Sequence, residues 1–333
     1  MPHDKVQRAN HFCMLILTSI AITVSLYFTA EVLVPFVFAL IIYEALLPIQ
    51  KKMEVKWDLS ESVTDPIIFM IFMAFLIGII FFIVVSVGDF INLVDFYKNT
   101  FQTWGNNIIA SLQGQGISLN TEKLKPMVSD LPILGTIKSF ATNVFGFVGQ
   151  LSLVALLVGF LVFGSRKGIP DGHLLREVNE AISAYLATKF ATSFITAILT
   201  AIILWFFDSD LILVISFLTF LLNFIPSIGS IFATLLPLPI LALKLGFGVE
   251  LVVCLSLLGA TQFTIGNIIE PKFMGKNVNL HPITIMVFLL FWGIVWGVPG
   301  MFLSVPITAS IKILFSRLEA TQPIARLMEG KLA

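Results

Sequence analysis

The chain has 333 residues, of which 57% are hydrophobic and only 12% are charged, with a mean hydropathy of +0.98 and a formal net charge of zero. A soluble chain carries about twice that fraction of charge, so the composition is typical of a polytopic membrane protein embedded in a lipid bilayer. The chain has no basic run, so no nucleic-acid partner is expected. The two cysteines and His281 show neither metal-ligand spacing nor a nucleophile–base pairing, so we expect no metal, no cofactor and no enzyme activity.

Residues 1–87 predict a group of N-terminal transmembrane helices. Apolar runs cover residues 12–29, 32–47 and 67–87, the second of which contains Pro35 and is followed by Pro48. The first run leads almost directly into the second and has no small-residue cleavage site, so it is predicted to be a retained anchor and not a signal peptide.

Residues 88–144 form the one sizeable polar region, predicted to be extracytoplasmic. Apolar residues recur in it every three or four positions, which predicts an amphipathic helix over 89–112 that ends at Gly114–Gly116. Such a stripe can lie on the membrane surface, pack on the transmembrane helices or pair with copies of itself in a homo-oligomer. Its members are Phe90, Val94, Tyr97, Phe101, Trp104 and Ile108.

Residues 145–333 are predicted to form the transport core. It begins with a span at 145–163, and a mixed helix from His173 then continues into a span that ends near Phe207. Threonine recurs at every fourth position of this helix, at Thr192, Thr196 and Thr200, beside a row of small residues. These hydroxyl groups could line a substrate path, or each could bond to the carbonyl group four residues back in its own helix.

Residues 211–243 are apolar but interrupted near the middle by Asn223, Pro226, Ser227, Gly229 and Ser230. As one helix they would extend nearly 50 Å, against a hydrocarbon core of about 30 Å, while each half reaches only about 20 Å. The lengths therefore predict a re-entrant hairpin that turns at Pro226–Gly229. We call this segment the first hairpin.

Residues 281–315 repeat this design and are called the second hairpin, broken at Gly297, Pro299 and Gly300 and followed by Pro306. Two Gly/Pro-interrupted segments in corresponding places indicate the binding site of a transporter. Ordinary helices with proline kinks are the alternative for both. At the tips, glycine would supply a positive φ.

Another span, at 247–264, contains Gln262 and leads through Asn267 to Glu270. The fold class is thus an all-α polytopic membrane protein with about six full transmembrane helices and two broken, re-entrant hairpins in an inverted repeat. With both termini in the cytoplasm, the hairpins open from opposite faces and most of the 20 Lys and Arg residues lie inside, as the positive-inside rule requires. The residues left outside are Lys98, Lys123, Lys125, Lys138 and Lys244.

Four motifs carry a family resemblance that covers nearly the whole chain. They are YLATK, NFIPSIGSIFATLLPLPILAL, IIEPKFMGKNVNLHP and FWGIVWGVPGMFLSVPITASIKI, and the N-terminal pattern Pro35, Ala39, Pro48 accompanies them. Together they resemble the autoinducer-2 exporter family of bacterial membrane transporters, and within it the branch that exports the quorum-sensing signal autoinducer-2. The resemblance implies an inner-membrane permease that forms a homo-oligomer, and some members of the family are described as sodium or lithium/proton antiporters.

Neutral donors and acceptors at the breaks suit a small polar metabolite or the coordination of a monovalent cation. The candidate substrate-binding residues are Asn223, Ser227, Ser230, Gln262, Asn267 and Glu270. No predicted span has a charged residue at its centre, which weakens the antiporter alternative. Glu270 could titrate, cap a helix end or pair with Lys272. A membrane scaffold that does not transport is the third alternative, but such a scaffold needs no irregular backbone at depth.

Overall fold

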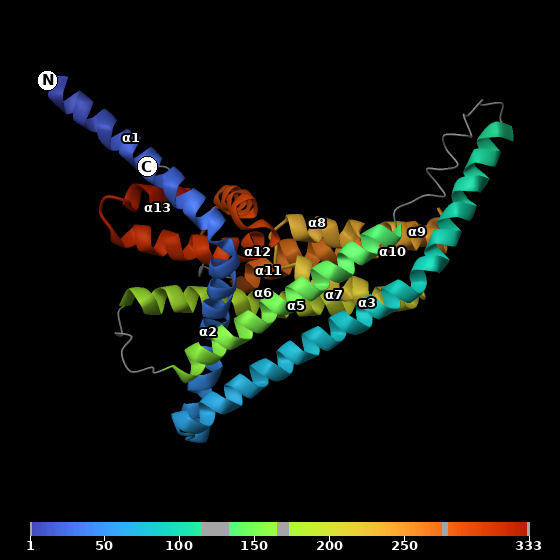
Figure 1. The fold of residues 1–333 in the computed structure, drawn as a ribbon, viewed down its shortest axis with the longest axis horizontal. Coiled ribbons are helices and arrows are strands. Elements are labelled where there is room, and N and C mark those ends of the chain that lie inside the picture. Colours follow the sequence, from blue (N-terminus) through green and yellow to red (C-terminus); the bar gives the residue numbers. More distant parts are fainter. Residues whose placement is uncertain (1, 115–132, 165–172, 275–278, 332–333) are drawn as a thin grey trace. The chain divides into compact units, whose positions relative to one another are not determined.

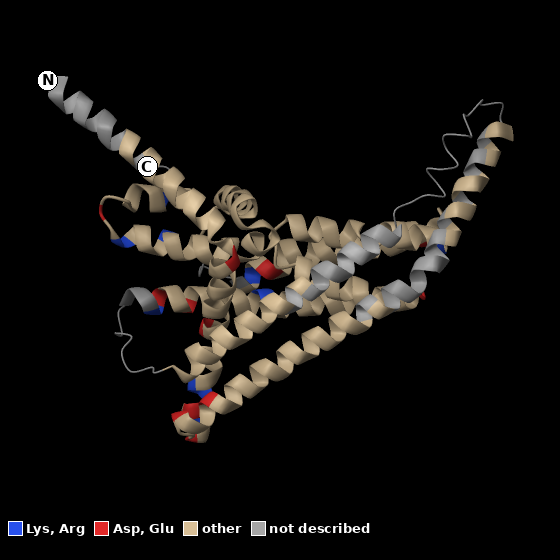
Figure 2. Cartoon of the chain, in the orientation of Figure 1, with Lys and Arg blue, Asp and Glu red and all other residues tan. Residues whose placement is uncertain are grey.

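The computed structural model describes residues 2–114, 133–164, 173–274 and 279–331 (Figure 1). All described elements are helices, and six of them are long and apolar enough to cross a membrane, so the predicted all-α polytopic class is confirmed. Figure 2 shows long stretches of these helices without Lys, Arg, Asp or Glu, with the charged residues gathered mainly at the helix ends. The six are Ala30–Trp57, Glu61–Val85, Arg176–Phe206, Ile228–Leu245, Val249–Phe273 and Pro282–Arg317.

The chain forms two compact units. Unit 1 comprises residues 1–70, 151–187 and 274–333. It contains α1 (Pro2–Phe28), α2 (Ala30–Trp57), α12 (Pro282–Arg317) and α13 (Gln322–Met328). Its core gathers apolar side chains from α2, α6 (His173–Phe206) and α12, and the Trp296 indole Nε1 donates to the carbonyl oxygen of Leu26 at 2.9 Å.

Unit 2 comprises residues 71–150 and 188–273. It holds five short elements in succession: α7 (Ile212–Leu222), α8 (Ile228–Leu235), α9 (Leu238–Leu245), α10 (Val249–Thr264) and α11 (Glu270–Met274), with a π-helical turn at Ile265–Ile269 between the last two. The apolar faces of α7, α9 and α10 form its core around Leu211, Ile215, Leu241 and Cys254. Three longer helices belong partly to each unit: α3 (Glu61–Gly114), α5 (Ile133–Phe163) and α6 (His173–Phe206).

The polar region begins inside α3, which continues across residue 88 and ends at Gly114. The predicted third span and the amphipathic stripe therefore belong to one helix of 54 residues. The side chains of the stripe lie outside the part of the chain that the structure describes, so its role in assembly stays a prediction.

The first hairpin reverses direction between α7 and α8, which pack against each other. Ile228 N donates to the carbonyl oxygen of Pro226 at 2.6 Å, and this two-residue bond forces Ser227, between them, to a φ of 59° and a ψ of −51°. A γ-turn of this hand is rare and strained. At the base, Lys244 Nζ lies 2.9 Å from Asp210 Oδ1, so the two ends of the segment meet.

The second hairpin reverses at Gly297, where φ is 66° and ψ is −147° inside α12. Its ends also meet, because both contact the C-terminal segment. His281 N donates to the carbonyl oxygen of Met328 at 2.8 Å, and Lys312 Nζ lies 2.5 Å from Glu329 Oε1. In Figure 1, α13 lies beside α12, as this pairing requires.

Gly229 and Gly300 serve the tips in a different way from the one predicted. Neither has a positive φ; the residues that do are Ser227 and Gly297. Instead, a Cβ atom on Gly229 would overlap the carbonyl oxygen of Leu222, and one on Gly300 would overlap that of Trp292. Each glycine therefore allows the second arm to touch the backbone of the first, which the sequence pattern cannot distinguish from a need for positive φ.

We expect Gly229→Ala or Gly300→Ala to be enough to disrupt a hairpin. The added methyl group must push two backbone segments apart, which costs about 1–3 kcal/mol of unfolding free energy. Thermal unfolding of the purified protein measures the loss. Gly259→Ala in α10 is the control, since its Cβ would meet only the Thr234 methyl group at 3.9 Å. Equal stability of all three variants would contradict the close approach.

Acid should release the C-terminal segment from α12. Hydrogen bonds from Lys312 and then Lys331 lower the pKa of the Glu329 carboxyl below its ordinary value. Its stabilising contribution is therefore complete above the ordinary value and is lost as the pH falls through the lowered one. The protection factors of the amide hydrogens of residues 318–331, which correct for the intrinsic pH dependence of exchange, should fall over that window. Glu329→Gln should show low protection at every pH, and protection factors in the native protein that do not depend on pH would refute the assignment.

Candidate functional site

A buried polar cluster surrounds the tip of the first hairpin, entirely within unit 2. At its centre is Lys189 of α6, whose side chain is only 3% exposed. The ammonium group lies 2.6 Å from Glu270 Oε1 and donates to the carbonyl oxygen of Asn223 at 3.0 Å. Glu270 is itself only 12% exposed. The two opposite charges thus meet where the hairpin backbone leaves helical geometry.

Asn223 connects the hairpin tip to the small-residue face of α6. Its amide Nδ2 lies 3.3 Å from Ser193 Oγ and 3.4 Å from Thr196 Oγ1. Asn223, Ser193 and Thr196 are all buried. Because Lys189, Ser193 and Thr196 lie at helical spacing, one face of α6 presents an ammonium group and two hydroxyl groups to the turn.

The π-helical turn explains how Glu270 reaches Lys189. The buried residues of α10 follow a regular stripe, Leu251, Cys254, Leu258, Gln262 and Ile265, which would continue at residue 269 in a regular helix. The turn contains one extra residue, so Glu270 takes that position. Its N–H donates to the carbonyl oxygen of Ile265, five residues back. Glu270 is thereby placed on the same face as Gln262.

Lys189 is the residue that sequence reasoning missed. It lies near the middle of the helix Arg176–Phe206, directly before the apolar run, and it is buried there. Its place before the apolar run suggested a cytoplasmic position, whereas the helix continues and buries it. For Glu270, the partner is Lys189 and not the adjacent Lys272.

The predicted substrate-binding residues separate into two groups. Asn223 and Glu270 belong to the cluster, and Gln262 is buried on the same helix as Glu270. Ser227 and Asn267 are exposed, and Asn267 Nδ2 bonds to the carbonyl oxygen of Phe263 in its own helix. Ser230 Oγ bonds locally to the carbonyl oxygen of Ser227 at 2.9 Å.

The threonine row makes the backbone bonds of its structural alternative, and its role in lining a substrate path stays a prediction. Thr192 and Thr196 donate to the carbonyl groups four residues back, at 2.9 and 2.7 Å, as the alternative had it. Thr196 also accepts from Asn223, and Thr200 is buried farther along the same face. The remaining turn residues, Pro226, Pro299 and Pro306, are parts of the two hairpins. Among the described residues, no cluster of three His, Cys, Asp or Glu side chains could hold a metal ion.

Comparison with protein families shows which family the chain belongs to. The family model for AI-2E family transporters matches residues 16–320. The chain belongs to the AI-2E transporter family. It is a multi-pass membrane protein of a bacterial transporter family, and membership implies a small-molecule substrate.

Curated relatives agree with the family. The chain is 26% identical over 312 residues to the AI-2 transport protein TqsA of Escherichia coli (strain K12), covering 90% of each chain. It is 22% identical to the putative transport protein YhhT of the same strain, covering 96% of this chain and 94% of that one. A putative transport protein of Borreliella burgdorferi is 31% identical over 206 residues, which is 56% of this chain and 57% of that relative.

Breaking the buried pair should destabilise the protein far more than breaking a surface pair. Lys189→Met leaves the Glu270 carboxylate buried without its cation, at a cost of about 3–5 kcal/mol. The double variant Lys189→Met/Glu270→Gln removes both charges and should recover most of that loss. Thermal unfolding compares these variants with Arg176→Gln, which breaks an exposed pair with Glu180. A Lys189→Met variant as stable as this control would contradict burial of the pair.

Proposed function

We propose that this AI-2E family transporter exports a small, neutral, hydroxylated metabolite such as autoinducer-2, and that the polar cluster at the first hairpin tip binds it. The observation that carries the proposal is the Lys189–Glu270 pair bonded to the turn through the carbonyl group of Asn223. The name of the relative TqsA supports autoinducer-2 as the substrate.

The charge of the cluster favours a neutral ligand. Lys189 and Glu270 compensate each other, so the site has no net charge to match. The hydroxyl groups of a metabolite can donate to the Glu270 carboxylate and to the Asn223 carbonyl oxygen, the two acceptors that Lys189 now occupies. Ser193 and Thr196 offer further hydroxyl partners on the adjacent face of α6. A ligand can therefore replace each bond that it displaces.

Sodium or lithium/proton antiport is the second candidate, and one observation favours it. A carboxylate, a backbone carbonyl group and two hydroxyl groups are the oxygen ligands that hard cations prefer. In the structure the Lys189 ammonium group lies against two of these oxygens. A cation would have to replace that ammonium group to reach them.

Localisation and assembly complete the proposal. We propose an inner-membrane protein with both termini in the cytoplasm that assembles as a homo-oligomer. Lys189 and Lys312 are buried, so they do not belong in the count of basic residues in loops. When both are left out of that count, the cytoplasmic side still has the excess of basic residues. A scaffold that does not transport has less support, because it has no use for a buried ionic cluster at a backbone turn.

Transport by the neutral double variant separates the two candidates. In proteoliposomes, Lys189→Met/Glu270→Gln should still export labelled autoinducer-2, with affinity weakened about tenfold because the Glu270 carboxylate no longer accepts from a hydroxyl group of the ligand. It should show no sodium-driven proton flux. Arg176→Gln/Glu180→Gln, which removes an exposed pair, should transport as the native protein does.

The same assay can overturn the proposal. Sodium-driven proton flux by the native protein, without autoinducer-2 flux, would establish antiport. If the native protein transports neither autoinducer-2 nor sodium, its substrate is a different one. Undiminished autoinducer-2 affinity in the double variant would move the binding site away from the first hairpin.

A further inference from the structure

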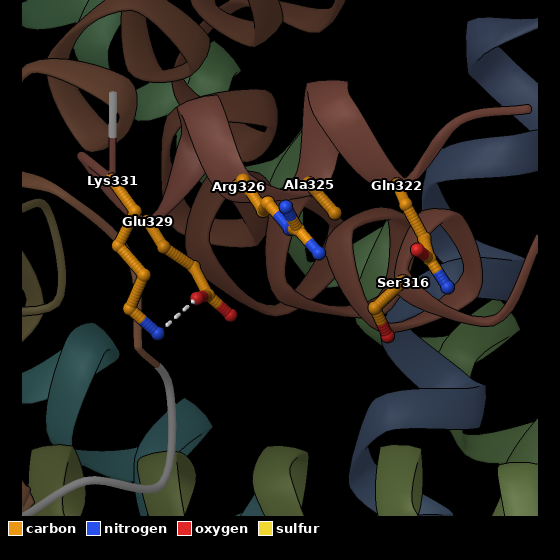
Figure 3. A pocket seen from close by; sticks show the side chains of 6 residues that line it. All are labelled: Ser316, Gln322, Ala325, Arg326, Glu329 and Lys331. Atoms are coloured by element: carbon orange, nitrogen blue, oxygen red, sulfur yellow. Dashed lines mark hydrogen bonds and ion pairs between the residues drawn. The ribbon is translucent and has the colours of Figure 1, made fainter. Parts of the chain in front are cut away.

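A second polar site lies in unit 1, at the end of the second hairpin. A pocket of about 290 Å³ opens between the last turn of α12 and α13. In Figure 3 the side chain of Arg326 lies between the Glu329–Lys331 pair and the polar groups of Gln322 and Ser316. The lining residues are Ser316, Gln322, Ala325, Arg326, Glu329 and Lys331.

The charges around this pocket leave an unmatched cation. The Glu329 carboxylate bonds with one oxygen to Lys312 at 2.5 Å and with the other to Lys331 at 2.7 Å. One acid therefore faces two lysines. The guanidinium group of Arg326 has no ion pair or hydrogen bond with any residue in the described ranges. The pocket therefore has an excess of positive charge and hydrogen-bond donors, the chemistry that binds an oxyanion.

The surface beside the pocket is apolar. On α13, Ala325 and Met328 are buried, while Ile324 is 48% exposed and Leu327 58% exposed. Leu318, which directly follows α12, is also exposed. Because α12 is a membrane-crossing candidate and the pocket begins at its last turn, these side chains lie next to the point where a membrane segment ends. Apolar side chains beside a cationic pocket match an amphiphile and not a soluble ion.

We propose that this pocket binds the phosphate head group of an anionic phospholipid. Arg326 and Lys331 would hold the phosphate, Ser316 and Gln322 would bond to its remaining oxygens or to the glycerol, and the acyl chains would lie along Leu318, Ile324 and Leu327. The head group bridges α12 and α13, so its binding fastens the C-terminal segment against the base of the second hairpin.

Lipid retention tests the proposal. Native mass spectrometry of the full-length protein in detergent, titrated with phosphatidylglycerol or phosphatidylcholine, should show preferential binding of phosphatidylglycerol. Arg326→Gln should weaken that binding about tenfold or more, since it removes a charge-assisted contact. Arg176→Gln is the matched control in the same unit, because Glu180 already partners that guanidinium group at 2.9 Å. Inorganic phosphate at millimolar concentration should not displace the lipid.

Three outcomes would overturn the assignment. Equal binding of phosphatidylglycerol by Arg326→Gln and Arg176→Gln would place the lipid elsewhere. Equal affinity of the native protein for the two lipids would remove the anionic head group as the ligand. Displacement by inorganic phosphate would make the pocket a site for soluble anions. Because Arg326→Gln leaves the Lys312–Glu329 pair intact, unchanged thermal unfolding of this variant confirms that a loss of lipid reflects the pocket and not the fold.

Discussion

Backbone that leaves helical geometry inside an apolar segment must find partners for its polar groups, and the structure of unit 2 follows from this requirement. The turn at the first hairpin leaves the carbonyl group of Asn223 to be satisfied by a donor from α6, which is Lys189. An ammonium group buried there needs a counter-charge, which Glu270 supplies. Glu270 reaches it only because a π-helical turn restores the alignment of the buried face of α10. The irregular turn of the first hairpin thus explains why Lys189 is buried, why Glu270 lies beside it, and why a π-helical turn follows α10.

The two hairpins share a construction although their sequences differ. Each tip has one residue with positive φ, Ser227 or Gly297, followed by a glycine that contacts the backbone of the preceding arm. Each base has a lysine on the second arm bound to a carboxylate. The bases differ in strength: Lys244 and Asp210 form a partly exposed pair, worth about 0–1 kcal/mol. Lys312 and Glu329 are more deeply buried, so the ends of the second hairpin are harder to separate than those of the first.

The sequence predicted what depends on composition and segment length: the helical class, the places where both hairpins reverse, and Asn223 and Glu270 as members of one region. It could not predict features set by packing. The π-helical turn leaves no pattern in residue type, so the pairing of Glu270 with Lys189 in place of Lys272 was invisible. The burial of Lys189 was missed because a lysine before an apolar run is typical of a cytoplasmic helix end. The glycines at the hairpin tips were located correctly, but the reason predicted for them was wrong, because close backbone approach and a positive φ both favour glycine.

The internal bonds of the cluster also bear on how a ligand can enter it. Lys189 satisfies both Glu270 and the Asn223 carbonyl group, so the cluster exposes no unpaired charge to its apolar surroundings. A hydroxylated ligand bound at this cluster, as we propose, would compete with this ammonium group for the same acceptors, which favours modest affinity and ready release. Because one of those acceptors belongs to the hairpin backbone, displacing Lys189 also frees the turn at which Ser227 is strained. Binding and loosening of the hairpin tip would then be one event, which is the coupling that a transporter needs between its substrate and its moving part.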